Sequence, residues 1–250
     1  MSVGDRLLEL AHTDERAVLF TVIEGPQPGA RLLVLLDRDG ETVGDAPAAL
    51  ATLAPDVRRN GMHEVEGLKV FAEVYGPPPR LVIVGAVDTA EALCSAAGHL
   101  GWHTICIDPR ALFATRERIP SADELVVEWP DVALERIAPD HNTAVLTLTH
   151  DEKFDVPALK AALRTEAFYV GAIGSRRTQA KRRERLLEDG VTDAELAQIY
   201  GPAGLDIGAD TPAEQAISML SEALAVRAGR AGTPLKTAPG RIHVEEIGAA

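Results

Sequence analysis

Short apolar runs alternate with amphipathic segments from residue 80 onward. The apolar runs predict strands, which we place at residues 80–84, 104–107, 125–127, 144–149 and 168–173. The segments between them have helical spacing and predict helices over residues 89–100, 131–137, 157–163 and 176–188. Strands that are apolar throughout and alternate with helices are typical of a parallel sheet. We therefore predict an α/β fold, with a Rossmann-like parallel sheet covered by helices on both faces.

The usual order of such a sheet is 3-2-1-4-5, which would place the switch point between strand 80–84 and the strand that ends at Thr149. Two Thr-x-x-Glu capping boxes, which begin at Thr192 and Thr211, predict two closing helices, the second with Pro212 at its first position. Ligands of open α/β sheets bind beyond the carboxyl ends of the strands at the switch point. The candidate site residues are therefore those that follow the strands.

The first 76 residues have a different pattern, with alternation and turns in place of buried runs. The pattern predicts paired strands at 17–23 and 31–37, a hairpin with Gly67 at its turn and a strand at 68–75, and helices at 5–11 and 46–54. We predict a small α+β N-terminal domain over residues 1–76. A stiff proline linker at 77–79, the Rossmann-like domain at 80–228 and a tail at 229–250 would follow.

Composition and charge argue against several classes of function. The formal net charge is −13, which argues against binding to nucleic acid or to an acidic membrane surface. No apolar run is long enough to cross a bilayer and no leader pattern opens the chain, so we expect a cytoplasmic protein. Cys94 and Cys106 lack metal-ligand spacing and are predicted to be buried thiols, and we assign no metal site to the protein itself. Phosphate-loop, nucleophile-elbow and H-E-x-x-H motifs are absent from the sequence, which argues against a P-loop enzyme or a nucleophilic hydrolase.

The turn after the first strand of the Rossmann-like domain resembles a dinucleotide fingerprint in part. Gly85 stands at its first glycine, and Asp108 stands where the ribose-binding acid is expected. Val87 replaces the second glycine, and Asp88 adds a negative charge at the helix N-terminus. Both changes oppose a bound pyrophosphate, so we favour a helix-capping turn over NAD(P) binding.

The turn after the last predicted strand is better suited to an anion. Gly174 and Ser175 lead into a helix that begins with Arg176 and Arg177, so free N–H groups, a positive helix end and two guanidinium groups coincide. We predict phosphate binding at Gly174, Ser175 and Arg176, and we interpret the basic residues from Lys181 onward as a solvated helix face.

Two further segments have alternative interpretations. Thr149 and His150 follow the strand at the switch point, and His150 could bind or protonate a ligand or could simply form the turn. The glycine-rich loop at 201–208, which contains Asp206, could approach a ligand or make a tight entry to the next helix.

Five motifs occur in order along the chain. They are Pro-Pro-Pro-Arg-Leu-Val-Ile-Val-Gly at 77–85, Val-Glu-Trp-Pro-Asp at 127–131, Leu-Thr-His-Asp at 148–151, Gly-Ala-Ile-Gly-Ser-Arg-Arg at 171–177 and Gly-Leu-Asp-Ile-Gly-Ala-Asp-Thr-Pro-Ala-Glu at 204–214. Together they resemble the XdhC/CoxI family of xanthine dehydrogenase accessory factors. The resemblance implies a protein that binds the molybdenum cofactor, promotes its sulfuration and delivers it to a molybdenum hydroxylase such as xanthine dehydrogenase. It also implies a homodimer, with a cysteine desulfurase as a second candidate partner.

The chain departs from the family pattern at two places, which would make it a divergent member. The family usually has Gly-x-Gly-His after the first strand, where this chain has Gly85, Val87 and Asp88, and the family's N-terminal cysteine is missing. The leading hypothesis is a chaperone in which Arg176 and the Gly174–Ser175 backbone hold the phosphate of a molybdopterin-type cofactor, while His150 and Asp206 orient the rest. The alternatives are an NAD(P)-dependent oxidoreductase and a ligand-free interaction module of the same fold.

Overall fold

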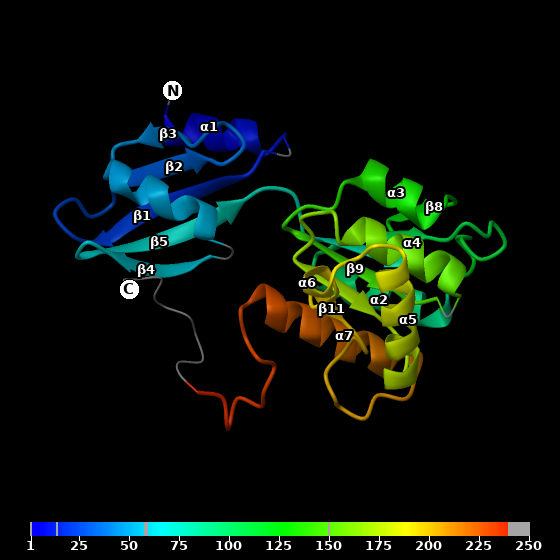
Figure 1. Cartoon of the computed structure of the whole chain (residues 1–250). Coiled ribbons are helices and arrows are strands. Elements are labelled where there is room, and N and C mark those ends of the chain that lie inside the picture. Colours follow the sequence, from blue (N-terminus) through cyan, green and yellow to red (C-terminus); the bar gives the residue numbers. More distant parts are fainter. Residues whose placement is uncertain (1, 14, 58–59, 150, 240–250) are drawn as a thin grey trace. The chain divides into compact units, whose positions relative to one another are not determined.

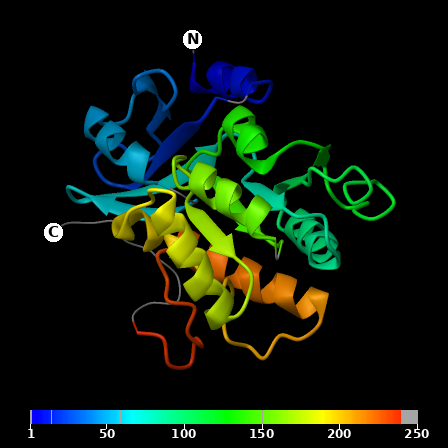
Figure 2. The same cartoon turned by 45° about the vertical axis from the view of Figure 1, so that its right-hand side comes forward.

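A computed structural model describes residues 2–13, 15–57, 60–149 and 151–239 (Figures 1 and 2). The chain divides into two units, one formed by residues up to Pro77 and from Leu235 onward, the other by Pro78–Pro234. No helix among the described residues is both long enough and apolar enough to cross a membrane.

The first unit is built on a five-stranded antiparallel sheet of order β3-β2-β1-β5-β4. Its elements are α1 (Val3–Leu10), β1 (Ala17–Glu24), β2 (Arg31–Leu35), β3 (Glu41–Gly44), the 3-10 helix η1 (Ala48–Asp56), β4 (Gly61–Val65) and β5 (Leu68–Tyr75). The alternation of β1 separates two cores: Phe20 packs on the η1 side with Leu50, and Leu19 packs on the α1 side with Leu10. An antiparallel sheet with helices thus precedes the parallel sheet, as the sequence predicts.

Two elements of this unit differ from the prediction. The expected helix at 46–54 is a 3-10 helix at Ala48–Asp56, because Pro47 at its cap offers no side-chain hydrogen bond and Pro55 lies within it. Strand β3 was not predicted, because it is polar and largely exposed at the sheet edge and so has no apolar signal. The predicted hairpin is confirmed, and Gly67 adopts a positive φ at its turn.

The second unit contains a six-stranded parallel sheet of order β11-β10-β9-β6-β7-β8. Its strands are β6 (Arg80–Val84), β7 (His103–Ile107), β8 (Glu124–Val126), β9 (Thr143–Thr147), β10 (Tyr169–Ala172) and β11 (Ile199–Tyr200). The first five have the predicted order 3-2-1-4-5, and the short edge strand β11 extends it. The switch point lies between β6 and β9, as predicted.

Helices cover both faces of this sheet. They are α2 (Asp88–His99), α3 (Pro130–Ile137), α4 (Glu152–Ala162), α5 (Arg176–Glu188), α6 (Asp193–Leu196) and α7 (Pro212–Arg227). Leu81 and Ile83 of β6 pack with residues of α2 and α7, whereas Val82 and Val84 pack with residues of α3, α4 and α5. The strands from β6 to β10 each contribute side chains to two separate cores, which explains their mainly apolar sequences.

The helix boundaries follow local capping. Both predicted capping boxes are present, at Thr192 for α6 and at Thr211 for α7. Helix α4 begins at Glu152 rather than at the predicted 157, because the Asp151 side chain caps it by accepting the N–H of Lys153 at 3.0 Å. The start predicted at Pro157 was wrong because proline is common in the first turn, whereas here it lies inside the helix.

Candidate functional site

A cavity of about 1010 Å³ lies in the second unit at the carboxyl ends of β6, β9 and β10. Its walls come from residues 87–89 and 173–176, from the loop at 202–209 and from the side of α7. This volume is at the upper end of the range for small-molecule sites. The cavity is next to the topological switch point, where a ligand of an open α/β sheet is expected.

Three helix N-termini border this cavity: Asp88 of α2, Arg176 of α5 and Pro212 of α7 all line it. Each N-terminus is equivalent to about half a positive charge. Ser175 caps α5 by accepting the N–H of Thr178 at 3.2 Å, while the N–H groups of Arg176 and Arg177 have no acceptor among the described residues. In contrast to α5, the first turn of α2 has no side-chain cap among the described residues, so the helix-capping interaction expected at this turn is not present. Three helix dipole ends therefore border the space, together with free backbone donors of α5; α7 offers fewer donors, because it begins with Pro212 and is capped by Thr211.

Most of the predicted anion-binding residues line the cavity. Gly174, Ser175 and Arg176 are in its wall, and Gly174 has a φ of +128°, which favours glycine at this turn. The guanidinium group of Arg176 is exposed and makes no ion pair or hydrogen bond within the described parts of the chain. Arg177 is also exposed but is not part of the wall.

Carboxylates border the cavity too. Asp206, a predicted site residue, lines it from the 202–209 loop, as does Asp88 from α2. The Asp88 carboxylate lies 3.9 Å from Arg118, which partly balances its charge. The charged side chains in the wall are therefore two carboxylates and one guanidinium group. The binding of any anion there would depend strongly on the helix ends.

Hydrogen bonds with residues of α7, which no sequence motif indicated, hold the loop at 202–209 in place. Glu222 accepts hydrogen bonds from the Gly204 N–H at 2.8 Å and from the Tyr169 hydroxyl at 2.6 Å. The hydroxyl of Ser218 donates to the Leu205 carbonyl at 2.7 Å. Burial, and then the Glu222 carboxylate, raise the pKa of Tyr169. One feature of the sequence is consistent with this contact: Ser218 lies on the buried face of a predicted helix.

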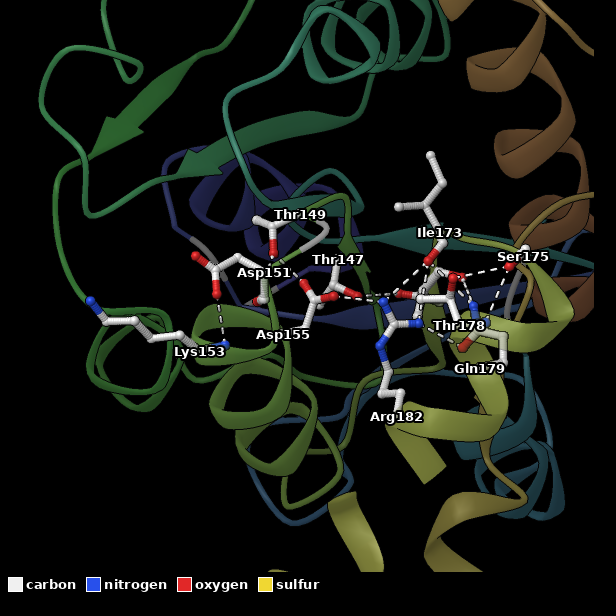
Figure 3. Close-up of polar contacts among 12 residues, drawn as sticks. Thr147, Thr149, Asp151, Lys153, Asp155, Ile173, Ser175, Thr178, Gln179 and Arg182 are labelled. Atoms are coloured by element: carbon white, nitrogen blue, oxygen red, sulfur yellow. Dashed lines mark hydrogen bonds and ion pairs between the residues drawn. The ribbon is translucent and has the colours of Figure 1, made fainter. Parts of the chain in front are cut away.

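Gly85 and Thr149 are packed against each other and are not part of the cavity wall. A Cβ on Gly85 would lie 2.7 Å from the Thr149 methyl group, and Gly85 has a φ of +110°. The Thr149 hydroxyl donates to Asp155, whose carboxylate forms an ion pair with Arg182 at 2.6 Å (Figure 3). Arg182 in turn donates to the Ile173 carbonyl at 3.2 Å, just after β10. This buried network ties the ends of β9 and β10 together behind the cavity.

Asp108 and His150 complete the predicted residues. Asp108 is fully buried and receives hydrogen bonds from the N–H of Ala86 at 2.9 Å and from Arg110. Burial opposes its ionisation, but these hydrogen bonds outweigh burial and hold the pKa of Asp108 below its ordinary value. It does not line the cavity. His150 lies outside the described residues.

Neither cysteine is accessible to a ligand. Cys94 and Cys106 are both fully buried, and burial raises the pKa of Cys94 to about 12 and also raises that of Cys106. In the described residues, no group of three or more His, Cys, Asp or Glu side chains could hold a metal ion. The donor set at the cavity is thus oxygen and nitrogen, which suits phosphate and heterocycle groups rather than a thiolate-bound metal.

The chain is similar in sequence to several known proteins. Residues 81–223 match the family described as the XdhC Rossmann domain. The chain is 32% identical over 183 residues to the molybdenum cofactor insertion chaperone PaoD of Escherichia coli (strain K12), which covers 73% of this chain and 50% of that protein. It is 28% identical over 165 residues to a protein of Bacillus subtilis (strain 168) that is named as a probable xanthine dehydrogenase component, covering 66% of this chain and 48% of that protein. The chain therefore spans about half the length of these curated relatives.

One solved structure is similar over nearly the whole chain. It is the crystal structure of a protein from Bacillus halodurans described as a xanthine dehydrogenase, with a TM-score of 0.54 and 22% identity. The likeness covers 96% of this chain and 98% of that one. It supports the arrangement of an antiparallel sheet unit followed by a Rossmann-like unit.

Proposed function

The chain belongs to the XdhC family, and from this premise we propose that it is an accessory protein that holds a molybdenum cofactor and delivers it to a molybdenum hydroxylase of the xanthine dehydrogenase type. The relationship to a protein named as a molybdenum cofactor insertion chaperone supports this assignment. The recipient enzyme, a cysteine desulfurase as a sulfur source and a homodimeric state are parts of the same proposal.

The observation that carries the proposal is the cavity with Arg176 and the α2 and α5 N-termini in its wall. A molybdopterin-type cofactor has a terminal phosphate, and backbone N–H groups at a helix N-terminus bind phosphate well. The N–H groups of Arg176 and Arg177 are without intramolecular acceptors in the described chain, and the free guanidinium of Arg176 adds a charge-assisted contact. The phosphate would therefore sit at the Gly174–Arg176 turn.

The 202–209 loop in the cavity wall suits the heterocycle. A pterin carries amino and ring N–H donors, and an ionised carboxylate is an acceptor-only group with two oxygens. Asp206 is exposed in the cavity wall, on a loop that Glu222 and Ser218 hold in place. We assign Asp206 to the pterin donors, and His150 stays a predicted contact on the basis of its place after β9.

The two other functions that the sequence suggested have less support. An NAD(P)-dependent oxidoreductase needs Asp108 for ribose, but that carboxylate is buried and bonded to Arg110 and to the Ala86 N–H. A ligand-free interaction module does not account for a cavity bordered by free N–H donors. The carrier function accounts for the cavity and does not require Asp108 to bind a ligand.

The test is to co-express the protein with an active molybdenum cofactor pathway, purify it and measure released pterin by fluorescence. We expect the wild-type chain to retain pterin and the Arg176→Ala variant to lose it by at least tenfold, because one charge-assisted hydrogen bond contributes about 1.5–3 kcal/mol. The control is Arg185→Ala on the same helix, where the side chain is exposed and paired with Glu188 at 2.9 Å instead of lining the cavity.

Each outcome of this experiment decides a separate point. Pterin retained by the wild type and by Arg185→Ala but not by Arg176→Ala supports both the carrier function and the phosphate position. Equal retention by all three proteins removes Arg176 from the site but keeps the carrier. Absence of pterin from every protein, with no transfer of activity to an apo-hydroxylase, contradicts the carrier function.

A further inference from the structure

Asp108 has no capacity left for a ligand. Its Oδ1 accepts the backbone N–H of Arg110 at 2.9 Å and the Arg110 Nε at 2.8 Å. Its Oδ2 accepts the Ala86 N–H at 2.9 Å and the Arg110 guanidinium at 2.7 Å. A carboxylate offers about four lone-pair sites, two on each oxygen. Protein donors therefore occupy all of them.

The position of this carboxylate is the one that binds ribose in dinucleotide-binding folds of the same order. Asp108 follows β7, the second strand, and Ala86 follows β6, the first strand. In such folds an acidic residue near this point accepts hydrogen bonds from the ribose hydroxyl. Here Arg110 supplies the donors that a ribose would supply, from only two residues along the chain.

Aromatic rings hold the Arg110 side chain over the carboxylate. The guanidinium carbon lies 4.1 Å from the ring centroid of Phe113 and 5.5 Å from that of Phe154. The Asp108 carboxylate also raises the pKa of Arg110, so the guanidinium remains charged. Cation–π contact and a bidentate ion pair together give the side chain one preferred position.

We infer that Arg110 is a specificity-determining residue. Its guanidinium group occupies the Asp108 acceptors that a nucleotide ribose would use, and so prevents a ribonucleoside from binding at the carboxyl end of β7. This inference concerns the end of β7, whose Asp108 does not line the cavity, and it does not depend on the identity of the cargo. It predicts that the fold's ribose site can be reopened by removing the guanidinium.

The test uses adenosine, which has the ribose and a base but no phosphate, so that the charge of Asp88 does not affect it. Binding is followed by amide NMR shifts of Ala86 and residue 110 in the full-length protein. We expect the wild type to show no binding up to the highest adenosine concentration used. Arg110→Ala should bind with a Kd at least tenfold below that concentration, because it frees acceptor sites on both Asp108 oxygens. Arg110→Lys, which keeps the charge but has fewer donors, serves as a second variant if Arg110→Ala does not fold.

Two controls make the result specific. Arg118→Ala removes the other arginine that stacks on Phe113, at 4.8 Å, but leaves the Asp108 contacts intact, and it should not gain binding. The double variant Arg110→Ala/Asp108→Asn should lose the gain, because the charged acceptor is absent. Equal affinity of wild type and Arg110→Ala, a gain that survives Asp108→Asn, or no binding by folded Arg110 variants overturns the inference.

Discussion

Single residues set the close contacts at the carboxyl edge of the parallel sheet. Gly174, Ser175 and Arg176 could be predicted to lie together because a strand, a glycine turn and a capped basic helix follow one another in the sequence. The saturation of Asp108 by Arg110 could not be predicted in this way. It depends on the direction of one side chain, which Phe113 and Phe154 fix, and neither ring belongs to a motif.

The first prediction concerns two glycines. We expect Gly85→Ala to lower the free energy of unfolding by about 2–4 kcal/mol, since it combines a positive φ with overpacking against Thr149. Gly98→Ala is the control, because Gly98 lies in α2 with nothing within 4 Å of an added Cβ. That change should be neutral or stabilising by up to about 1 kcal/mol. Urea unfolding measures both, and similar losses in the two variants would contradict the close-contact explanation.

The second prediction concerns pH and His63 in β4. The ring is buried, its Nδ1 atom has no hydrogen-bond partner among the described residues, and burial lowers the pKa of His63 below its ordinary value. Below about pH 6.5 the unfolded chain binds this proton more readily than the folded unit does, so the free energy of unfolding should fall as pH decreases. NMR-monitored urea unfolding of residues 61–75 at pH 7.5 and 5.5 tests this. The His63→Gln variant should show a smaller pH dependence, and an unchanged slope would refute the assignment.

At the scale of elements, a buried polar network joins α4 and α5 beneath the site. Figure 3 shows Thr149, Asp155 and Arg182 directed toward one another, with Lys153 pointing away from them. The Asp155 and Arg182 side chains are 3% and 4% exposed. The strands around this network could be predicted from their apolar sequence, but the network could not, because Arg182 stands within a basic run that is typical of a solvated face.

The third prediction follows from this ion pair. Arg182→Met should destabilise the protein by about 3–5 kcal/mol, because it removes the guanidinium group that balances the charge of the buried Asp155 carboxylate. The double variant Asp155→Leu/Arg182→Met should recover most of that loss. Arg183→Met is the matched control, since Arg183 is the exposed neighbour paired with Asp193, and its loss should cost about 1 kcal/mol or less. If urea unfolding shows additive losses in the double variant, the ion pair is not the cause.

At the scale of the whole molecule, the topology of the parallel sheet could be predicted because the strands from β6 to β10 are mainly apolar and bounded by turns. The elements that the prediction missed, β3 and β11, are an exposed polar strand and a strand of two residues. Neither has enough buried side chains to produce a hydrophobic pattern. The accuracy of the prediction thus follows burial: it is good for the core and poor at the edges.

The net charge gives the fourth prediction, which rests on the proposed anionic cargo. A charge of −13 repels an anion at long range, whereas the helix ends attract it only nearby, because a dipole field falls faster with distance. Raising the ionic strength from about 0.01 M to about 0.15 M shortens the Debye length from about 30 Å to about 8 Å. The association rate of the cofactor should therefore increase. Stopped-flow pterin fluorescence measures it, and a rate that falls with salt would contradict this account.

The convergence of three helix ends on one cavity has a further consequence. Peptide N–H groups do not lose or gain protons in the physiological range, unlike histidine or lysine. Attraction that comes from the main chain is therefore built into the fold and is the same in a neutral as in a mildly acidic medium. An anion held there would be retained or released according to its own charge and to the geometry of the 202–209 loop, so any pH dependence of its binding would not come from the main chain.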